Sequence, residues 1–262
     1  MSPRRLFIAT LAASLLAGAA SVAAQTTIKV GVTAGPPAQI MEAVKAVAAK
    51  KGLTIQIVEF TDFVIPNTAL DAGEIQANAF QHQPYLDNQK ADRKFKIESV
   101  GQTYTVPLGI YSKKHKTWAD VPSGASIAIP NDPTNGGRAL LLLQAKGVIK
   151  LKPNVGLKPT PLDIVDNPKK FKIIEIDAAQ TSRSLDDVAA AAINTNYAVQ
   201  AGLDPAKDAI LQEDPKGPYV NIIAVRTVDK DKPWVKTLVE SYRSPEVKAF
   251  MADKFKSFLT SW

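Results

Sequence analysis

Runs of β-forming residues alternate with helical patterns along this chain, and this alternation limits the folds that it can adopt. Residues 27–33 (TIKVGVT) are an apolar, β-branched run that ends in turn residues. Residues 36–52 open with prolines, carry apolar side chains at helical spacing and stop at a glycine, and residues 53–60 (LTIQIVEF) are again strand-like. Such a strand–helix–strand order predicts a parallel sheet with helices on its faces.

The alternation returns in the second half of the chain. Strands are predicted at 125–130, 171–177, 190–194 and 219–226, and helices at 138–147 and 195–202. The C-terminal segment repeats apolar residues at helical spacing, first Val235, Leu238, Val239 and Tyr242, then Val247, Phe250 and Met251. Because no Ser/Gly-rich linker divides the halves, we predict an α/β protein of two lobes joined by crossing strands, with a ligand in the cleft between them.

The first 24 residues have the pattern of a secretory signal peptide. Arg4 and Arg5 precede the apolar run LFIATLAASLLAGAA, and small residues stand at the −3 and −1 positions of a cleavage point before Gln25. The apolar run is short for a bilayer span. We therefore predict that residues 1–24 are removed and that the mature protein is exported to the periplasm.

Cysteine is missing from the sequence, and the charge is moderately basic. Without a thiol, cysteine metal ligation and thiol catalysis are excluded, and a chain of 262 residues must be stable through its core alone. A lipid anchor would need a cysteine at the cleavage site, so we expect a protein that is not lipid-anchored. The formal net charge of +7 is spread over short lysine groups without interleaved aromatics, which argues against nucleic-acid binding.

The segment AIPNDPTNGGRALLLLQ, residues 128–144, joins a predicted strand to a Leu-rich helix. We expect the helix to begin near Arg138, where unpaired backbone amides favour an anion. Gly136 and Gly137 would let a ligand approach the backbone, and a guanidinium suits a carboxylate or phosphate. A surface arginine in a first helical turn explains the pattern equally well, and neither a Walker loop nor a dinucleotide fingerprint is present.

A second group of candidate residues is aromatic. Phe63, Phe80, His82 and Tyr85 fall within a short span, across separate turns and a predicted short strand at 77–80. Each of them taken singly could be an ordinary core residue. Together with the neighbouring amide side chains, they indicate a pocket with an apolar body and a few polar groups.

The third group is asparagine. Asn194 and Asn196 lie at a strand-to-helix turn, where asparagine commonly caps a helix. Asn221 interrupts a predicted strand, although strand interiors disfavour asparagine. A side-chain carbonyl at that position could accept a hydrogen bond from an ammonium group.

Five segments resemble the NlpA/MetQ-type family of methionine-binding proteins of bacterial ABC importers: FTDFVIPNTAL, GEIQANAFQHQPYLD, IPNDPTNGGRALLLLQ, SLDDVAAAAINTNYA and PYVNIIAVR. The resemblance runs from IKVGVT to the C-terminal helices. It implies a periplasmic-binding-protein fold of the type II kind. Lobe 1 would comprise 25–109 plus 227–262 and lobe 2 would comprise 110–226, with crossings near 108–111 and 222–226.

The resemblance also implies roles for individual residues. It places Phe63, Phe80 and His82 around the ligand side chain with Tyr85 nearby, Arg138 on the α-carboxylate, and Asn194 and Asn221 on the α-amino group. A methionine thioether gains from aromatic contacts, and each buried ligand charge would then have a partner. Position 63 is phenylalanine where the family often has tyrosine, so L-methionine, D-methionine and a methionine-containing dipeptide all stay open as ligands.

We therefore predict a monomeric solute-binding protein that captures methionine and delivers it to an inner-membrane permease with a cytoplasmic ATPase. It would use no cofactor or metal, and it would not be an enzyme. A secreted hydrolase or lyase is the enzyme alternative, but His82 and His115 are the only histidines and no GxSxG or HExxH pattern occurs. A binder of another apolar amino acid and an interaction protein without a small ligand are the remaining alternatives.

Overall fold

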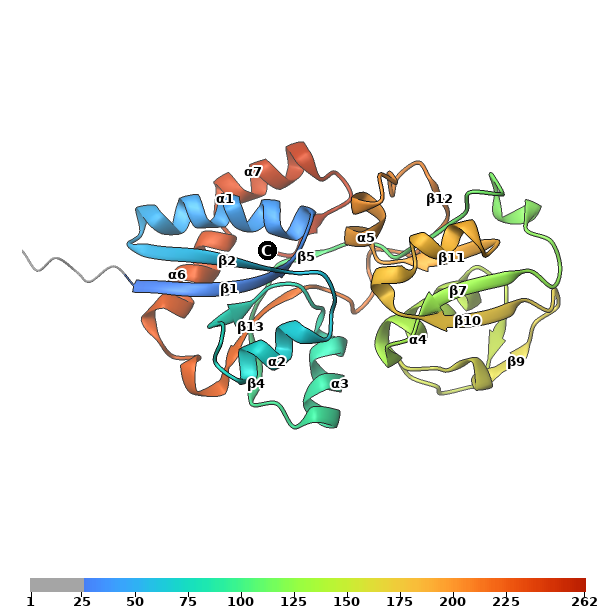
Figure 1. Cartoon of the computed structure of the whole chain (residues 1–262), viewed down its shortest axis with the longest axis horizontal. Coiled ribbons are helices and arrows are strands. Elements are labelled where there is room, and N and C mark those ends of the chain that lie inside the picture. The colour runs from blue at the N-terminus through green and yellow to red at the C-terminus, as the bar shows by residue number, and fades with distance from the viewer. Residues whose placement is uncertain (1–25) are drawn as a thin grey trace, which may run out of the picture.

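The chain folds into two lobes, each built around a five-stranded sheet (Figure 1). This computed structural model describes residues 26–262, so the predicted signal peptide lies outside the described residues. The mixed α/β architecture with two lobes is as predicted from the alternating pattern.

The first lobe has the strand order β2-β1-β3-β13-β4. β1 is parallel to β2 and β3, whereas β13 is antiparallel to β3 and β4. Its strands are β1 (Thr26–Thr33), β2 (Leu53–Phe60), β3 (Ala77–Asn78), β4 (Ile97–Gln102) and β13 (Ile222–Arg226), and a small sheet pairs β5 (Tyr104–Thr105) with β14 (Leu259–Thr260). Its helices are α1 (Pro36–Lys50), α2 (Ile65–Asp71), α3 (Gln83–Arg93), α6 (Pro233–Tyr242), α7 (Pro245–Lys254) and the 3-10 turn η5 (Thr227–Asp229).

Both faces of this sheet are covered by helices. Alternate residues of β13 enter different cores: Ile223 and Val225 pack with α1, α6 and α7, whereas Ile222 and Ala224 pack with α2 and α3. A strand buried on both faces reads as a continuous apolar run, and residues 222–225 of β13 form such a run.

The second lobe has the strand order β10-β7-β11-β6-β12. β7 is parallel to β10 and β11, and β6 is antiparallel to β11 and β12. Its strands are β6 (Gly109–Tyr111), β7 (Ser126–Pro130), β8 (Lys150–Leu151), β9 (Ile164–Asp166), β10 (Lys172–Ile176), β11 (Ala190–Ile193) and β12 (Ala209–Gln212). Its helices are α4 (Pro133–Ala145) and α5 (Thr195–Gln200), with 3-10 turns η1 (Trp118–Asp120), η2 (Pro161–Asp163), η3 (Ala178–Gln180) and η4 (Arg183–Asp186).

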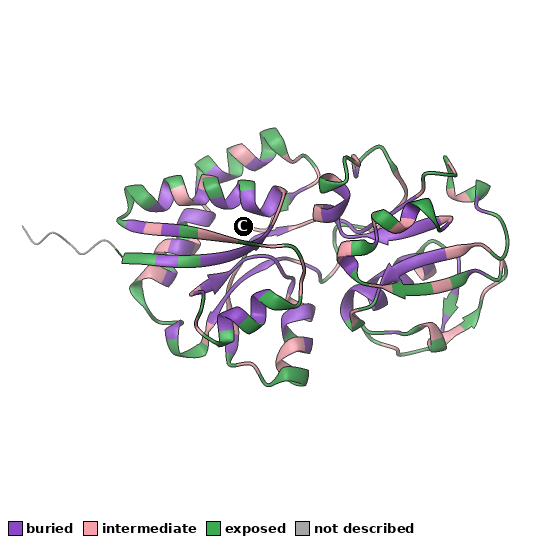
Figure 2. Cartoon of the chain, viewed as in Figure 1, coloured by how far each residue is buried: buried purple, intermediate pink, exposed green. Residues whose placement is uncertain are grey.

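β7, an interior strand of the second sheet, is also buried on both faces. Ile127 and Ile129 of β7 pack in the core under α4, and Ala128 packs in the core that includes α5. In Figure 2 the inner strands of both lobes are buried while the outer helix faces are exposed. Each sheet is therefore buried in hydrophobic clusters of its own lobe.

Two segments of chain connect the lobes. One runs from β5 to β6 through residues 106–108, and the other runs from β12 to β13 through residues 213–221. The predicted division assigned 222–226 to the second lobe, but β13 is hydrogen-bonded to β3 and β4 in the first sheet. An apolar run predicts a strand but does not say which sheet it joins, and the second crossing accordingly lies before β13 rather than within it.

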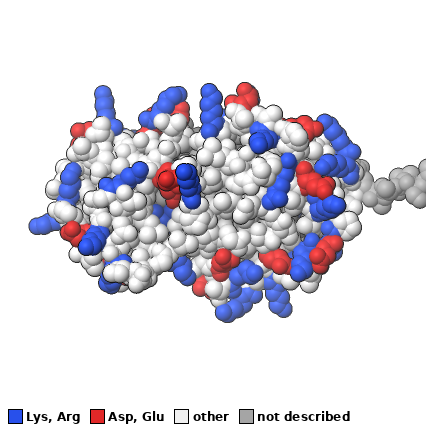
Figure 3. Space-filling model, turned by 180° about the vertical axis from the view of Figure 1, so that it is seen from behind, with Lys and Arg blue, Asp and Glu red and all other residues white. Residues whose placement is uncertain are grey.

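The molecular surface carries interspersed charges. On the face shown in Figure 3, lysines and arginines alternate with aspartates and glutamates over both lobes. Within residues 26–262, no helix has the length and apolar character that a membrane span requires.

Candidate functional site

A pocket lies between the lobes and is bordered by both connecting segments. The space it encloses, including the part open to solvent, is about 510 Å³. Every site residue predicted from the sequence lines it: Phe63, Phe80, His82, Tyr85, Arg138, Asn194 and Asn221. The remaining lining residues are Thr33, Pro37, Gln81, Tyr104, Val106, Leu108, Asn135, Thr195, Asn196 and Phe258.

One wall of the pocket is aromatic. The ring centroids of Phe63 and Phe80 are 5.9 Å apart, and Tyr85 meets Phe80 edge-on at 6.0 Å. Burial, followed by the nearby Asp132 and Asp62, raises the pKa of Tyr85, so its hydroxyl stays protonated and donates to the carbonyl oxygen of Phe63 at 2.7 Å. The Tyr85 ring is thereby fixed with its polar atom satisfied, and the wall is apolar.

The start of α4 differs from the prediction. The helix begins at Pro133, not near Arg138, and the side chain of Asp132 accepts hydrogen bonds from the backbone amides of Thr134 and Asn135. Asp132 followed by proline is an ordinary helix-start signal that the Gly-rich turn obscured. The first-turn amides are therefore capped from within the chain, and the predicted anion site at the helix start is wrong.

The two glycines before Arg138 allow close packing and do not mark a ligand approach. A Cβ on Gly136 would lie 2.6 Å from the carbonyl oxygen of Pro130, and one on Gly137 would lie 2.6 Å from that of Leu157. Cβ atoms essentially never come closer than 3.0 Å to another heavy atom of this kind. Both positions therefore need glycine so that α4 can pack against neighbouring backbone.

Arg138 is buried and already paired with Glu213. Its Nε donates to both carboxylate oxygens of Glu213, at 2.9 and 3.0 Å, and its Nη2 donates to Glu213 and to the carbonyl oxygen of Val106. The ring of Tyr219 stacks 4.3 Å from the Arg138 Cζ. An arginine from the second lobe is thus fixed on both connecting segments.

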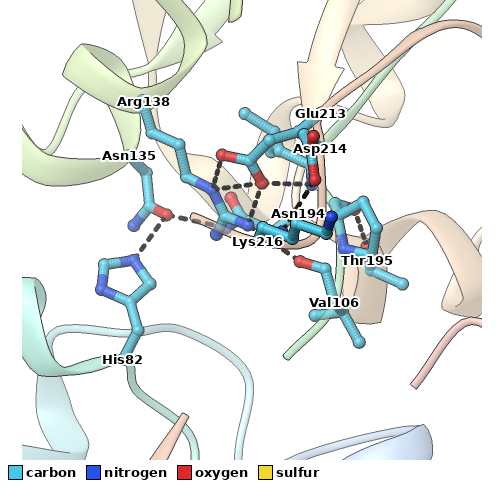
Figure 4. A network of polar contacts seen from close by, with 11 residues as sticks. His82, Val106, Asn135, Arg138, Asn194, Thr195, Glu213, Asp214 and Lys216 are labelled. Atoms are coloured by element: carbon cyan, nitrogen blue, oxygen red, sulfur yellow. Dashed lines mark hydrogen bonds and ion pairs between the residues drawn. The ribbon is translucent and has the colours of Figure 1, made fainter. Parts of the chain in front are cut away.

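His82, Asn135 and Asn194 form a hydrogen-bonded group beside Arg138 (Figure 4). His82 Nδ1 accepts from the backbone amide of Tyr85 and so caps α3. Its Nε2 therefore carries the proton and donates to Asn135 Oδ1 at 3.2 Å. Burial, and then the charge of Arg138, lower the pKa of His82 to about 3, so the imidazole is neutral.

Both predicted asparagines present carbonyl oxygens in this region. Asn194 occupies the N-cap position of α5 without capping it, because its Nδ2 donates to Asn135 Oδ1 at 2.8 Å while its Oδ1 has no partner. Asn221 lies just before β13 rather than inside a strand. In the orientation that suits its neighbours, its amide nitrogen donates to the carbonyl oxygens of Phe80 and Gln81 at 3.2 and 3.3 Å, leaving its oxygen as a spare acceptor.

Sequence reasoning missed Asn135, Glu213 and Tyr219. Asn135 lies in the segment quoted for Arg138, but its role depends on residues 53 and 59 positions away. Glu213 is 75 positions from Arg138, in a segment with no distinguishing pattern. No local signal in the sequence reports contacts of this range.

The lobes also touch outside the pocket. The hydroxyl of Tyr197 donates to the carbonyl oxygen of Thr61 at 3.2 Å, and Lys158 Nζ donates to Asn88 Oδ1 at 2.9 Å. In each pair one residue comes from each lobe. The pocket is consequently enclosed by lobes that are in contact.

A family model described as NlpA lipoprotein matches residues 28–261. The chain belongs to the NlpA lipoprotein family. Among similar proteins of this family, the D-methionine-binding lipoprotein MetQ of Salmonella typhimurium is 54% identical over 223 residues, which cover 84% of this chain and 82% of that protein. MetQ of Escherichia coli (strain K12) is 53% identical with the same coverage.

Solved structures of similar proteins agree with this membership. A nutrient-binding protein from Burkholderia cenocepacia bound to methionine has a TM-score of 0.88 and 56% identity, covering 90% of this chain and 100% of its own. An ABC transporter periplasmic substrate-binding protein from Coxiella burnetii has a TM-score of 0.86 and 48% identity, covering 89% and 100%. The relatives of this NlpA-family chain are thus substrate-binding proteins.

The prediction of a protein without a lipid anchor is wrong. The family and its similar members are described as lipoproteins, which implies attachment to a membrane through a lipid. The prediction depended on the absence of cysteine alone, and the count of one residue type does not outweigh a family match over residues 28–261.

Proposed function

We propose that this NlpA-family protein captures methionine, as the L- or D-enantiomer or both, and delivers it to a membrane ABC importer composed of a permease and an ATPase. The observation that carries the proposal is the meeting, in one pocket, of a fixed guanidinium, spare amide oxygens and an aromatic wall. The names of its relatives, methionine-binding proteins and components of ABC transporters, support it.

In this proposal each part of the ligand has a chemical partner. The Arg138 Nη1 group makes no hydrogen bond within residues 26–262, so it is available to donate to an α-carboxylate. Asn194 Oδ1 and the Asn221 oxygen would accept from an α-ammonium. Phe63, Phe80 and Tyr85 would surround the thioether, which gains from aromatic edges.

The proposed role is binding without catalysis, by a monomer. His82 has both ring nitrogens occupied and is neutral, so it is a poor general acid or base at ordinary pH. No cluster of three or more His, Cys, Asp or Glu side chains suited to a metal occurs among residues 26–262.

The proposal is tested by removing carried ligand and measuring binding. Protein is unfolded, dialysed and refolded, and the released ligand is identified by mass spectrometry. Isothermal titration with L-methionine, D-methionine, glycyl-methionine and leucine then ranks the ligands. Tight binding of leucine or the dipeptide without measurable binding of either methionine enantiomer would reject the assignment.

Arg138→Gln provides the residue-specific arm of the same test. It should weaken methionine binding by roughly 100-fold, since it removes a charged partner of a buried carboxylate. Arg183→Gln removes the same charge from an exposed position of the same lobe, and it should leave the affinity unchanged.

A further inference from the structure

The one cation that lines the pocket is paired with an anion of opposite charge before any ligand binds. Among the described lining residues, Arg138 is the one permanently charged side chain, and the buried His82 is neutral. Glu213 stands directly behind Arg138 and contributes the opposite charge. The side chains of Arg138 and Glu213 are only 4% and 14% exposed, so solvent screens this pair little.

Glu213 is held in place by the connecting segments. Its carboxylate accepts from the backbone amide of Leu108 at 3.1 Å, and its own backbone amide donates to the Leu108 carbonyl oxygen at 2.9 Å. Figure 4 shows the Glu213 carboxylate beside the Arg138 guanidinium, with Asn135 and His82 farther along the same group. The negative charge is therefore part of the fixed framework of the pocket.

We propose that Glu213 is a specificity-determining residue, which cancels the charge of Arg138 and so makes the pocket select a zwitterion over an anion of the same shape. This inference rests on the proposed function, because it concerns the charge of the amino acid that the pocket would bind.

The physical reason lies in the two ends of the ligand. The carboxylate of any ligand on Arg138 is repelled by Glu213, whether or not the ligand carries an ammonium group. An ammonium group is attracted by Glu213, and only a zwitterion has one. In a partly buried site, an interaction between unit charges several ångströms apart changes affinity by roughly tenfold or more.

The test compares two ligands that differ in the ammonium group alone. Methionine and 4-(methylthio)butanoate share the thioether chain and the carboxylate. Their dissociation constants are measured by isothermal titration on the refolded full chain and on Glu213→Gln. The dissociation constant of methionine divided by that of 4-(methylthio)butanoate should rise by about tenfold in the variant, because only methionine loses an attraction.

The ratio separates this role from a merely structural one. If Glu213 only positioned Arg138, the substitution would weaken both ligands alike and leave the ratio unchanged, and that result would overturn the inference. Asp214→Asn is the matched control, since Asp214 is the exposed neighbour and its carboxylate caps the backbone amide of Lys216. The control should keep the wild-type ratio within about twofold.

Folding of each variant is checked by its thermal transition. Should Glu213→Gln not fold, Glu213→Ala is measured with the same ligands and the same criterion. Wild-type protein that fails to bind methionine refutes the proposed function. Wild-type protein that binds methionine, together with an unchanged ratio in the Glu213 variant, refutes this inference alone.

Discussion

His82 Nε2 lies 3.2 Å from Asn135 Oδ1, and this hydrogen bond joins the start of α3 in the first lobe to the first turn of α4 in the second. The same oxygen accepts from Asn194 Nδ2 at 2.8 Å, and the Asn135 amide nitrogen donates to Asp132 Oδ2. The Asn135 side chain therefore bonds the two lobes together and also fixes the orientation of the Asn194 amide.

Asn135→Ala should weaken methionine binding by about tenfold or more. The substitution leaves two buried donors without an acceptor and frees the Asn194 amide to rotate, and each unpaired buried group costs about 1–3 kcal/mol. Isothermal titration measures the change. Asn131→Ala, an exposed position just before α4, is the control; equal affinities for the two variants would contradict the role given to Asn135.

Tyr197→Phe should lower methionine affinity by roughly three- to tenfold with little change in the free energy of unfolding. It removes the interlobe hydrogen bond to the Thr61 carbonyl oxygen, and binding that requires contact between the lobes weakens when the closed state loses a bond. Tyr111→Phe is the matched control, because the buried Tyr111 hydroxyl has no partner in the described chain. An affinity loss of the same size in both variants would rule out the interlobe explanation.

Stability should fall as the pH decreases below about 6.5, through His82. Burial and Arg138 lower its pKa to about 3, below the ordinary value of 6.5, so the unfolded chain binds a proton that the folded chain does not. This contribution is complete above the unfolded pKa and is lost as the pH falls toward 3. At pH 5 the loss from this group amounts to about 2 kcal/mol of unfolding free energy.

Urea unfolding at pH 7 and pH 5 measures this effect. His82→Asn keeps a side-chain acceptor for the Tyr85 amide but has no titrating group, so its stability should depend less on pH over this range. His115→Asn removes the other histidine and should retain the wild-type pH dependence. If the His82 variant instead keeps the full dependence, the effect comes from other groups.

Gly137→Ala should destabilise the protein by about 1–3 kcal/mol. Its Cβ would lie 2.6 Å from the Leu157 carbonyl oxygen and 2.8 Å from the Lys158 Cα, so α4 or the 157–159 segment must move. Gly217→Ala is the comparison, because the nearest atom to its Cβ is at 3.4 Å, an ordinary contact. Thermal or urea unfolding should show a clearly lower stability for Gly137→Ala than for Gly217→Ala. Equal stabilities would show that a methyl group fits between α4 and the 157–159 segment.

Several elements could be predicted because their signals are local. The apolar runs at β1, β2 and β7 and the helical spacing of α1 and α6 correspond to the observed elements within a few residues. The start of α4 was misplaced although Asp132 and Pro133 carry an ordinary start signal, because the glycines that follow resemble a loop. The sheet that β13 joins could not be predicted, since strand pairing is decided by distant partners.

Sequence alone determined which chemistry is present: a chain of alternating strands and helices with a guanidinium, amide groups and clustered aromatics in recognisable segments. Folding decided how these groups meet, pairing Arg138 with Glu213 and bringing His82 to Asn135 across the lobes. The difference has a physical cause. Periodicity and turn preferences act over a few neighbouring residues, whereas the charge of a pocket and the direction of an amide depend on atoms that only packing brings within 3 Å.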